Sequence, residues 1–355
     1  MKILVLGGTG AMGKPVVQIL AERKHQVYVT TRQERKSDMP NVRYLIGNAH
    51  DVEFIHSILK QRYDAIIDFM IYNPLEFQKS VDFYLENTGQ YIFISSARVY
   101  ADASDTLITE ESPRLLDITQ DVVYLKTNEY ALAKAREENI LLDGKYGNYT
   151  IIRPYITYND ERLQLGVFEK EHWLQRALKG KTIVFSKDIA ERTTTLTYGY
   201  DVALRIADLT GKSCAMGQIY NIAADRSIQW KDVLEIYLEV LEKHLERRPK
   251  VYITEKCDAL SEWTRHYQVH SDRLFDRKFS AEKVQRDSGE KKPFTSPEEG
   301  LRKCLQMFLA GKKEFLYVDW KREGIFDNIA DDRTKYCDIP GAKNKVKYFL
   351  CRHLK

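Results

Sequence analysis

Two side chains that could move a proton together, Tyr130 and Lys134, stand four residues apart in the stretch Tyr-Ala-Leu-Ala-Lys. Positions i and i+4 share one face of a helix, so a phenol and an ammonium group would project together. A phenol is a poor base near neutral pH, but a nearby positive charge favours the phenolate. The pair could therefore exchange a proton with an alcohol or sugar hydroxyl. In a chain with 22 tyrosines such pairs also arise by chance, so other residues must support this interpretation.

Two serines, Ser95 and Ser96, stand where an expected strand, Gln90–Ser95, ends. Ligands of open α/β sheets bind outside the carboxyl ends of the strands. A hydroxyl at this place could hydrogen-bond the oxygen at which a reaction occurs. Either serine could instead cap the turn, and the nearby Tyr100 could belong to the core.

Glycines recur at every third position from Gly7 to Gly13, between an expected strand, Lys2–Leu6, and an expected helix, Lys14–Arg23. Glycine lets the backbone turn tightly and approach a pyrophosphate, and the N–H groups of a helix N-terminus attract phosphates. The alternative is a tight turn without a ligand. The placement favours a dinucleotide-binding loop. Its candidate contacts are Gly7, Thr9, Gly10, Ala11, Met12 and Gly13.

The end of the second expected strand, Gln26–Thr30, should select the dinucleotide. An acidic side chain usually holds the ribose 2′-hydroxyl of NAD there, whereas this chain has Thr31 and Arg32, followed by Arg35 and Lys36. A guanidinium beside a hydroxyl suits a 2′-phosphate, so NADP is favoured over NAD. Arg32 could also stack on the adenine or face water, with NAD bound without the acidic contact.

Short β-rich runs alternate with helical patterns through the first half of the chain, which is typical of βαβ units around a doubly wound parallel sheet. The expected strands are Lys2–Leu6, Gln26–Thr30, Arg43–Ile46, Ala65–Phe69, Gln90–Ser95 and Thr150–Arg153. The expected helices are Lys14–Arg23, Val52–Lys60, Pro74–Leu85 and Asn128–Leu142. Asp51 could reach an adenine amino group or, equally well, cap the helix that follows it.

The regular alternation of expected strands and helices ends after Pro154. The expected elements there are helices at Glu169–Leu178, Val202–Leu209, Trp230–Glu246 and Pro297–Leu309, and β-like runs at Thr182–Phe185 and Thr194–Thr197. We expect a dinucleotide-binding domain at residues 1–155. A later segment, at about 194–224, is expected to return to this domain. A substrate lobe is expected at 156–193 and 225–320, and a basic extension at 321–355.

The glycine loop, the Ser96 segment, the Tyr130/Lys134 pair and Arg153-Pro154 together resemble the extended short-chain dehydrogenase/reductase superfamily. Within it the chain is similar to nucleotide-sugar epimerases and dehydratases, over about residues 1–310. The resemblance implies a Rossmann-type α/β domain with a smaller C-terminal substrate lobe. It also implies that Tyr130 is the acid/base, that Lys134 binds the nicotinamide ribose, and that Ser96 polarises the substrate oxygen.

Motif position within the superfamily implies further contacts. Those to the cofactor are Thr31, Arg32, Asn48, Asp51, Phe69, Ser95, Tyr130, Lys134 and Pro154. Those to the substrate are Ser96, Arg98, Tyr155 and Arg192. Later landmarks also fit the family, namely Asp201–Ala203, Ile219–Ile222 and the stretch from Asp272 to Leu301.

Three departures from the family pattern bear on the type of reaction and on the ligand contacts. Ser96-Ala97-Arg98 lacks the acid that follows in dehydratases, which points away from water elimination. Thr194 replaces an arginine that often contacts the nucleotide diphosphate, with Arg192 nearby, and Asn48 replaces the aspartate of a Gly-Asp pair. The implied reaction is hydride transfer at a hydroxyl carbon of a nucleotide-linked sugar, in an epimerase or an NADPH-dependent keto-sugar reductase.

Two non-enzymatic readings of the same fold stay open. A redox sensor would hold NADP without turnover, although such proteins typically lose the Tyr/Lys pair that this chain keeps. An RNA-binding relative would use the basic residues and the interleaved aromatics of 321–355, although charge runs usually mean a solvated surface. The homodimer common in the superfamily would pair the helices at Pro74–Leu85 and Asn128–Leu142 across a two-fold axis.

Charge and composition exclude other classes. There are 55 basic and 51 acidic residues, which leaves a net charge of +4, too small for a chain built around nucleic acid. Residues 321–355 carry nine basic and five acidic side chains, so the whole surplus lies there. Five dispersed cysteines and unclustered histidines predict reduced thiols and no metal site. With no apolar run of about 18 to 20 residues and no signal-like N-terminus, we expect a cytoplasmic protein without a membrane span.

Overall fold

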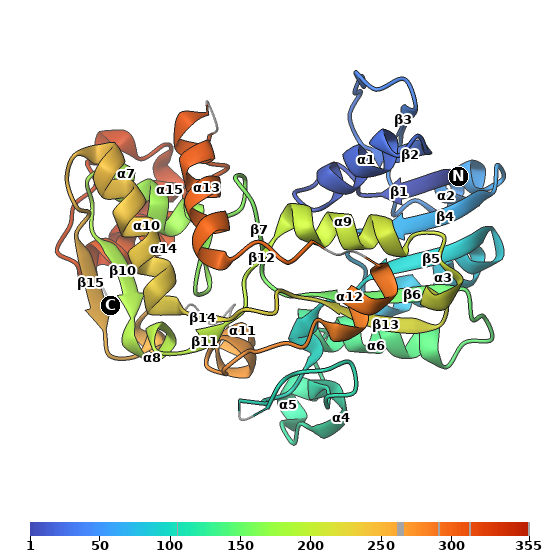
Figure 1. Cartoon of the computed structure of the whole chain (residues 1–355). Coiled ribbons are helices and arrows are strands. Elements are labelled where there is room, and N and C mark those ends of the chain that lie inside the picture. The colour runs from blue at the N-terminus through green and yellow to red at the C-terminus, as the bar shows by residue number, and fades with distance from the viewer. Residues whose placement is uncertain (105, 261–265, 290–291, 312–313, 354–355) are drawn as a thin grey trace. The chain divides into compact units, whose positions relative to one another are not determined.

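The computed structural model describes residues 1–104, 106–260, 266–289, 292–311 and 314–353. Its chain forms two compact units (Figure 1). The first unit comprises Met1–Thr157, Thr195–Arg226 and Arg277–Thr295, and the second comprises Tyr158–Thr194, Ser227–Asp276 and Ser296–Lys355. In the described ranges, no helix combines the length and the hydropathy that a membrane crossing requires.

A seven-stranded parallel sheet forms the centre of the first unit, in the order β13-β6-β5-β4-β1-β2-β3. Its strands are β1 (Lys2–Leu6), β2 (Gln26–Thr31), β3 (Val42–Ile46), β4 (Tyr63–Asp68), β5 (Thr88–Ile94), β6 (Tyr149–Pro154) and β13 (Gln218–Ile222). The strand order reverses between β1 and β4, which is the switch point where open α/β sheets bind ligands. The predicted Rossmann-type fold class is confirmed.

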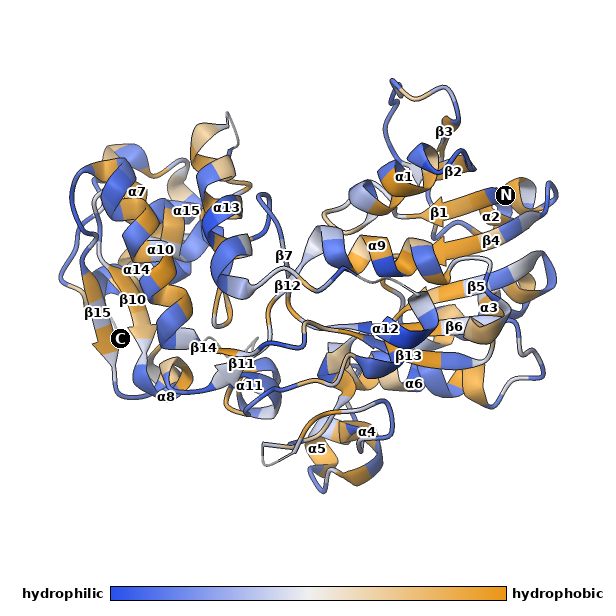
Figure 2. Ribbon diagram, viewed as in Figure 1, coloured by the Kyte–Doolittle hydropathy of each residue, from blue (hydrophilic) through white to orange (hydrophobic). Residues whose placement is uncertain are grey.

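Helices cover both faces of this sheet. The main ones are α1 (Gly13–Glu22), α2 (Val52–Leu59), α3 (Pro74–Glu86), α6 (Tyr130–Leu142), α9 (Gly199–Leu209) and α12 (Glu282–Ser288). Along β1, Ile3 and Val5 join one core cluster with residues of α1 and α9, while Leu4 and Leu6 join a second cluster with residues of α2 and α3. Figure 2 shows hydrophobic and hydrophilic residues alternating along α9, as expected for a helix with one face on a sheet.

Shorter elements complete the first unit. They are η1 (Ala97–Val99), α4 (Leu115–Ile118), α5 (Val122–Leu125), β12 (Thr197–Tyr198) and η2 (Ser213–Ala215). A further two-residue strand, β7 (Thr157–Tyr158), carries the chain past the end of the first segment.

The second unit is mainly helical. Its helices are α7 (Lys170–Leu178), α8 (Lys187–Ala190), α10 (Trp230–Leu245), α11 (His266–Gln268), α13 (Pro297–Ala310), α14 (Trp320–Ile329) and α15 (Ala342–His353), with single turns η3 (Cys257–Ala259), η5 (Val269–Arg273) and η6 (Tyr336–Asp338). Its short strands are β8 (Gln164–Leu165), β9 (Phe168–Glu169), β10 (Ile183–Ser186), β11 (Thr193–Thr194), β14 (Ile228–Gln229) and β15 (Val251–Thr254). Trp173 of α7 stacks on Tyr237 of α10, with ring centroids 4.3 Å apart.

The structure corrects two expected elements. The run Thr194–Thr197 is not one strand, since β11 ends at Thr194 and β12 begins at Thr197. The helix expected from Asn128 begins at Tyr130, because the Glu129 carboxylate accepts the Ala131 N–H and caps the helix there. Tyr130 is therefore the first residue of α6.

The basic C-terminal segment holds two helices that the sequence pattern does not predict, α14 and α15. The buried residues of α14 include Arg322 and Asp327, so charges interrupt its apolar stripe. Asp327 pairs with Arg176 at 2.8 Å and with Lys181 at 2.8 Å, which ties this segment to α7 and to the residues after it. Lys355, one of the nine basic residues, lies outside the described residues.

Candidate nucleotide-binding and catalytic site

The glycine loop between β1 and α1 has the shape that a pyrophosphate requires. Gly7 has a φ of +68°, which favours glycine. A Cβ on Gly13 would lie 2.6 Å from the Cα of Gly8, so the start of α1 packs directly on the loop. A Cβ on Gly10 would meet nothing closer than 3.9 Å, and no side chain caps α1, whose N-cap residue is Met12. The loop could thus bring backbone N–H groups to a diphosphate.

Alanine substitutions at two positions of this loop should separate an effect on stability from an effect on dinucleotide affinity. Gly13→Ala forces the new methyl against backbone and is expected to lower the free energy of unfolding by about 1 to 3 kcal/mol. Gly10→Ala has room in the free protein and should leave stability unchanged, while it weakens dinucleotide binding by at least about tenfold, because the methyl would occupy the space left for the phosphates. Chemical denaturation and fluorescence titration measure the two effects. Equal loss of stability in both variants would contradict this account of the loop.

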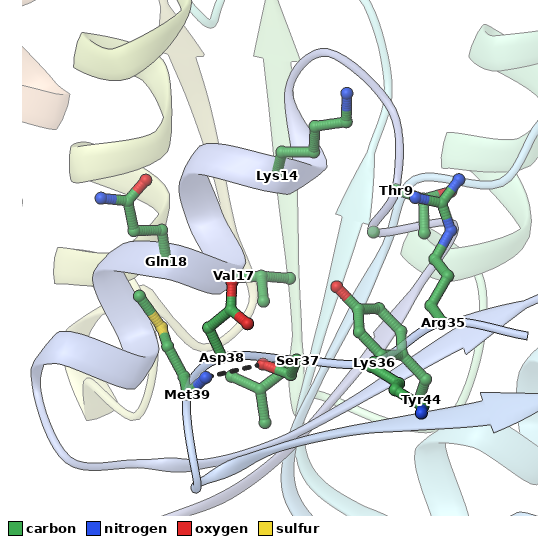
Figure 3. A pocket seen from close by; sticks show the side chains of 12 residues that line it. Thr9, Lys14, Val17, Gln18, Arg35, Lys36, Ser37, Asp38, Met39 and Tyr44 are labelled. Atoms are coloured by element: carbon green, nitrogen blue, oxygen red, sulfur yellow. Dashed lines mark hydrogen bonds between the residues drawn. The ribbon is translucent and has the colours of Figure 1, made fainter.

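A cavity of about 280 Å³ lies beside the loop, on the side of β2 and β3 (Figure 3). Three basic side chains line it, Lys14 of α1 and Arg35 and Lys36 from the segment after β2, together with the hydroxyl groups of Thr9 and Ser37. The cavity is also lined by Gly8, Val17, Gln18, Asp38, Met39, Val42 and Tyr44. A phosphate would find more cations than anions here.

Thr31 and Arg32 are less well placed to contact a 2′-phosphate than the sequence suggests. Arg32 is exposed and does not line the cavity. Thr31 is 7% exposed, and its hydroxyl donates to the carbonyl of Gln33 at 3.0 Å. The basic groups at the cavity come instead from Lys14, Arg35 and Lys36. Lys14 escaped the sequence analysis because only the fold brings the first turn of α1 beside the residues that follow β2.

The predicted adenine contacts lie at the end of β3. The Asp51 carboxylate accepts from the N–H groups of Glu53 and Phe54 and caps α2, which is the alternative that the sequence left open. Asn48 is exposed, and its side-chain oxygen accepts the N–H of His50 at 3.2 Å. Both residues lie on the loop from β3 to α2.

Two further predicted cofactor contacts, Phe69 and Pro154, lie at carboxyl ends of strands. Phe69 directly follows β4, and its Cβ would be 3.5 Å from a Cβ placed on Gly7, so it flanks the glycine loop. Pro154 is the buried last residue of β6 and pairs with Ile222 of β13.

Ser96, Arg98 and Tyr130 gather at the carboxyl end of β5. The Ser96 hydroxyl accepts the Arg98 N–H at 3.2 Å and caps η1, so its own hydrogen stays available for donation. The Arg98 guanidinium lies over the Tyr130 ring, 5.4 Å from its centroid, and pairs with Glu129 at 2.6 Å. Glu129 therefore holds Arg98 against the tyrosine that begins α6.

Lys134 is buried one turn further along α6. Its side chain is 2% exposed, and its ammonium group donates to Glu137 at 2.9 Å and lies over the Phe93 ring at 4.4 Å. Burial raises the pKa of Glu137 to about 7, against the lowering effect of Lys134. Burial also raises the pKa of Asp68, although Tyr91, Tyr72 and a backbone N–H donate to that carboxylate. The ammonium thus sits among carboxyl groups that the low-dielectric core makes hard to ionise.

The buried carboxylate of Glu138, adjacent to Glu137, joins several elements of this region. It accepts from Ser95 at 2.5 Å, from Arg114 at 3.1 Å and from Arg153 at 2.8 and 2.7 Å. The hydroxyl of Ser95, predicted as a cofactor contact, is therefore hydrogen-bonded within the protein. The sequence analysis missed Glu138, because two adjacent glutamates on a helix give no signal of which one is buried.

Arg153 extends this network toward β13. Its guanidinium donates to the Tyr100 hydroxyl at 2.7 Å, and that hydroxyl donates to Asn221 at 2.7 Å. Tyr155, a predicted substrate contact, is 1% exposed, and its ring lies 4.9 Å from that of Phe279. Tyr100 and Tyr155 therefore both belong to the interior of the first unit.

Arg192 belongs to the other unit. It is exposed, follows α8 in the second unit, and its carbonyl accepts the Trp230 N–H at 3.1 Å. The predicted site residues thus divide between the units, with Arg192 alone in the second. Among the described residues, no group of three or more His, Cys, Asp or Glu side chains is arranged to hold a metal ion.

Parts of this chain match known proteins. Residues 1–82 match the model of the NmrA-like family. The chain is 25% identical over 242 residues to the chloroplast stem-loop binding protein of 41 kDa b of Arabidopsis thaliana, which spans 64% of this chain and 60% of that protein. It is 28% identical over 152 residues to UDP-glucose 4-epimerase of Lactobacillus helveticus, which spans 40% of this chain and 46% of that protein. Less than two thirds of either relative is therefore matched.

A solved structure shares the fold over most of the chain. The UDP-glucuronic acid 4-epimerase of Bacillus cereus, in complex with UDP-glucuronic acid and NAD, superposes with a TM-score of 0.65, 16% identity, and coverage of 87% of this chain and 99% of that one. The chain therefore shares the fold of this epimerase, and these matches agree with the resemblance to the extended short-chain dehydrogenase/reductase superfamily that the motifs carry.

Proposed function

We propose that this chain, which has the fold of extended short-chain dehydrogenases/reductases, is an NAD(P)-dependent oxidoreductase of the epimerase type that acts on a nucleotide-linked sugar. The observation that carries the proposal is the cluster of Ser96, Arg98 and Tyr130 at the carboxyl end of β5, with Lys134 one turn along the same helix. The glycine loop follows β1 in the same sheet. The epimerase structure that shares this fold binds a nucleotide sugar and NAD, which supports the same substrate class here.

In this proposal the Tyr130 oxygen takes the proton of the sugar hydroxyl and later returns it. Ser96 donates its free hydrogen to the reacting oxygen, and Lys134 holds the nicotinamide ribose. A bound nicotinamide dinucleotide supplies reversible hydride transfer at the carbon that bears the hydroxyl. No acidic residue follows Ser96 in the stretch Ser-Ala-Arg, so the site has no evident acid for water elimination there.

The cofactor is proposed to be NADP, with NAD as the alternative. The support is the cavity lined by Lys14, Arg35 and Lys36 next to Thr9. A 2′-phosphate in that cavity would gain charge-assisted hydrogen bonds that a 2′-hydroxyl lacks. The same cavity favours a second candidate function, an NADPH-dependent keto-sugar reductase, in which Tyr130 donates its proton to the product alkoxide.

Charge reversal at Arg35 should change the cofactor preference. Arg35→Glu is expected to weaken NADPH binding by at least about tenfold, the size of a lost hydrogen bond to a charged group, while NADH binding stays within about twofold. Arg32→Glu is the matched control, because Arg32 does not line the cavity and its reversal should leave the NADPH/NADH ratio unchanged. Fluorescence titration of both dinucleotides gives the ratio. A larger change of the NADPH/NADH ratio in Arg32→Glu would show that Arg32, the residue favoured by the sequence, selects the cofactor.

Mass spectrometry of the purified protein after gentle denaturation tests the function itself. An epimerase regenerates its cofactor in each cycle, so the expected result is a retained nicotinamide dinucleotide and turnover of a nucleotide sugar without added cofactor. Consumption of added NADPH with a keto sugar would favour the reductase. Binding of a dinucleotide without turnover of any nucleotide sugar or keto sugar would overturn both in favour of a sensor.

The second unit, with Arg192, is proposed to supply substrate contacts. A homodimer is proposed to form through α3 and α6, and light scattering at the monomer mass would exclude it.

A further inference from the structure

A second cavity, of about 420 Å³, lies in the second unit. It is lined by Arg333, Thr334, Lys335, Tyr336, Tyr348, Arg352 and His353. All these residues follow α14, beyond the part of the chain that resembles the superfamily. A volume of several hundred Å³ is typical of small-molecule sites, and none of the residues proposed for the reaction contributes to it.

One wall of this cavity carries a buried positive charge. Arg352 is 9% exposed, and its guanidinium donates to the carbonyl of Asp332. In the part of the chain that the structure describes, Arg352 has no carboxylate within ion-pair distance. A buried charge with no counter-charge is costly. An anionic ligand would compensate it.

The nearby carboxylates are already neutralised. Asp332 accepts from Arg176 at 3.0 Å and from the Thr182 N–H at 2.7 Å. Burial opposes ionisation of Asp327, yet hydrogen bonds from Lys181 and Tyr348 and the charge of Arg176 hold its pKa below the ordinary value. These carboxylates therefore neutralise Arg176 and Lys181, and not the cations of the cavity.

Two further cations stand at the same cavity, Arg333 and Lys335. Both are exposed, and neither forms an ion pair with a described residue. Together with Arg352 they give the cavity three positive charges. Such a group suits a phosphate, which accepts several charge-assisted hydrogen bonds at once.

Two tyrosines give the cavity an aromatic surface. The rings of Tyr336 and Tyr348 lie 6.2 Å apart at an interplanar angle of 90°. The Tyr348 hydroxyl donates to Asp327 at 2.7 Å, which fixes that ring, while Tyr336 is 45% exposed. An exposed ring beside cations is the arrangement on which nucleobases stack.

We propose that this cavity binds a nucleoside monophosphate group, with the phosphate at Arg352, Arg333 and Lys335 and the base on Tyr336. The group is either a free mononucleotide or one nucleotide unit of a single-stranded RNA. The site is separate from the dinucleotide loop and does not rest on the proposed enzymatic function.

Calorimetric titration of the full chain with AMP tests the proposal, in the natural sequence and in the Gly10→Ala variant, whose dinucleotide loop is obstructed. Arg352→Gln is expected to weaken AMP binding by at least about tenfold. Because that variant could also disturb the fold, the exposed double variant Arg333→Glu/Lys335→Glu provides an independent loss. Tyr336→Ala should weaken AMP but not inorganic phosphate. Arg35→Glu, at the first cavity, should leave AMP binding unchanged under these conditions.

A single-stranded oligoadenylate of six nucleotides distinguishes the two sources. Binding at least about tenfold tighter than that of AMP, lost in the same variants, identifies RNA, and binding no tighter identifies the free nucleotide. Absence of AMP and oligonucleotide binding, or binding that survives both charge variants, would overturn the proposal.

Discussion

Tyr130→Phe is expected to lower turnover by at least about 100-fold, the contribution of a positioned acid/base, while dinucleotide affinity stays within about twofold. The substitution removes only the phenolic oxygen. The ring remains under Arg98, whose guanidinium lies 5.4 Å from its centroid, and the Glu129 cap of α6 does not involve the tyrosine side chain. The loss should therefore fall on proton transfer rather than on the fold or on cofactor binding.

Tyr146→Phe is the matched control for that experiment. It removes the same atom from a hydroxyl that donates to Glu86, away from the end of β5. Initial rates with the nucleotide sugar found by mass spectrometry, together with a dinucleotide titration, measure both variants. Full activity of Tyr130→Phe would eliminate the tyrosine as the acid/base.

Glu138→Gln is expected to destabilise the protein by about 3 to 5 kcal/mol, which is the usual cost of removing one partner from a buried ion pair. The Arg153 guanidinium makes two hydrogen bonds to this carboxylate, at 2.8 and 2.7 Å, and is 2% exposed. An amide would present a donor to one of these N–H groups and leave the buried charge without compensation. Urea denaturation at pH 8 measures the effect.

Glu137→Gln makes the same change at the adjacent residue and should behave differently. Since the pKa of Glu137 is raised to about 7, its ionisation costs stability as the pH rises from about 4.5 through 7. The amide can still accept from Lys134, and it does not ionise. Glu137→Gln is therefore expected to flatten this part of the stability profile and to destabilise the protein less than Glu138→Gln at pH 8, because burial already opposes the ionisation of Glu137 that pairs it with Lys134. Similar destabilisation by both variants would refute the distinction between the two glutamates.

Local sequence signals predicted the first unit well. Strand β1 has the predicted bounds, and the other predicted strands of the sheet differ from β2–β6 by at most two residues at an end. Strands β1, β4, β5 and β6 are buried along most of their length, so their apolar runs are continuous and easily found, whereas the edge strand β3 is partly exposed. The glycine loop was equally clear, because the tight approach of Gly13 to Gly8 disfavours a side chain at that position.

Properties that depend on tertiary contacts could not be predicted in this way. Arg32 and Arg35 have the same chemistry and lie three residues apart, and only the path of the segment after β2 places Arg35 at the cavity. The apolar pattern of α14 is hidden by the buried charges of Arg322 and Asp327. Arg322 lies over the Phe168 ring, and Asp327 pairs with Arg176 and Lys181 from a distant segment.

The assembly of the first unit from three stretches of chain has a consequence for its biosynthesis. Strand β13, which completes the sheet beside β6, and helix α9, which packs on α1, both come from the second stretch. A nascent chain that ends at Thr157 therefore has an unpaired edge on β6 and an uncovered apolar face on α1. Pairings between residues so distant in sequence slow folding and leave such edges exposed to aggregation. We therefore expect residues 1–157 to fold poorly in isolation, and dinucleotide binding to emerge only after the ribosome has passed Ile222.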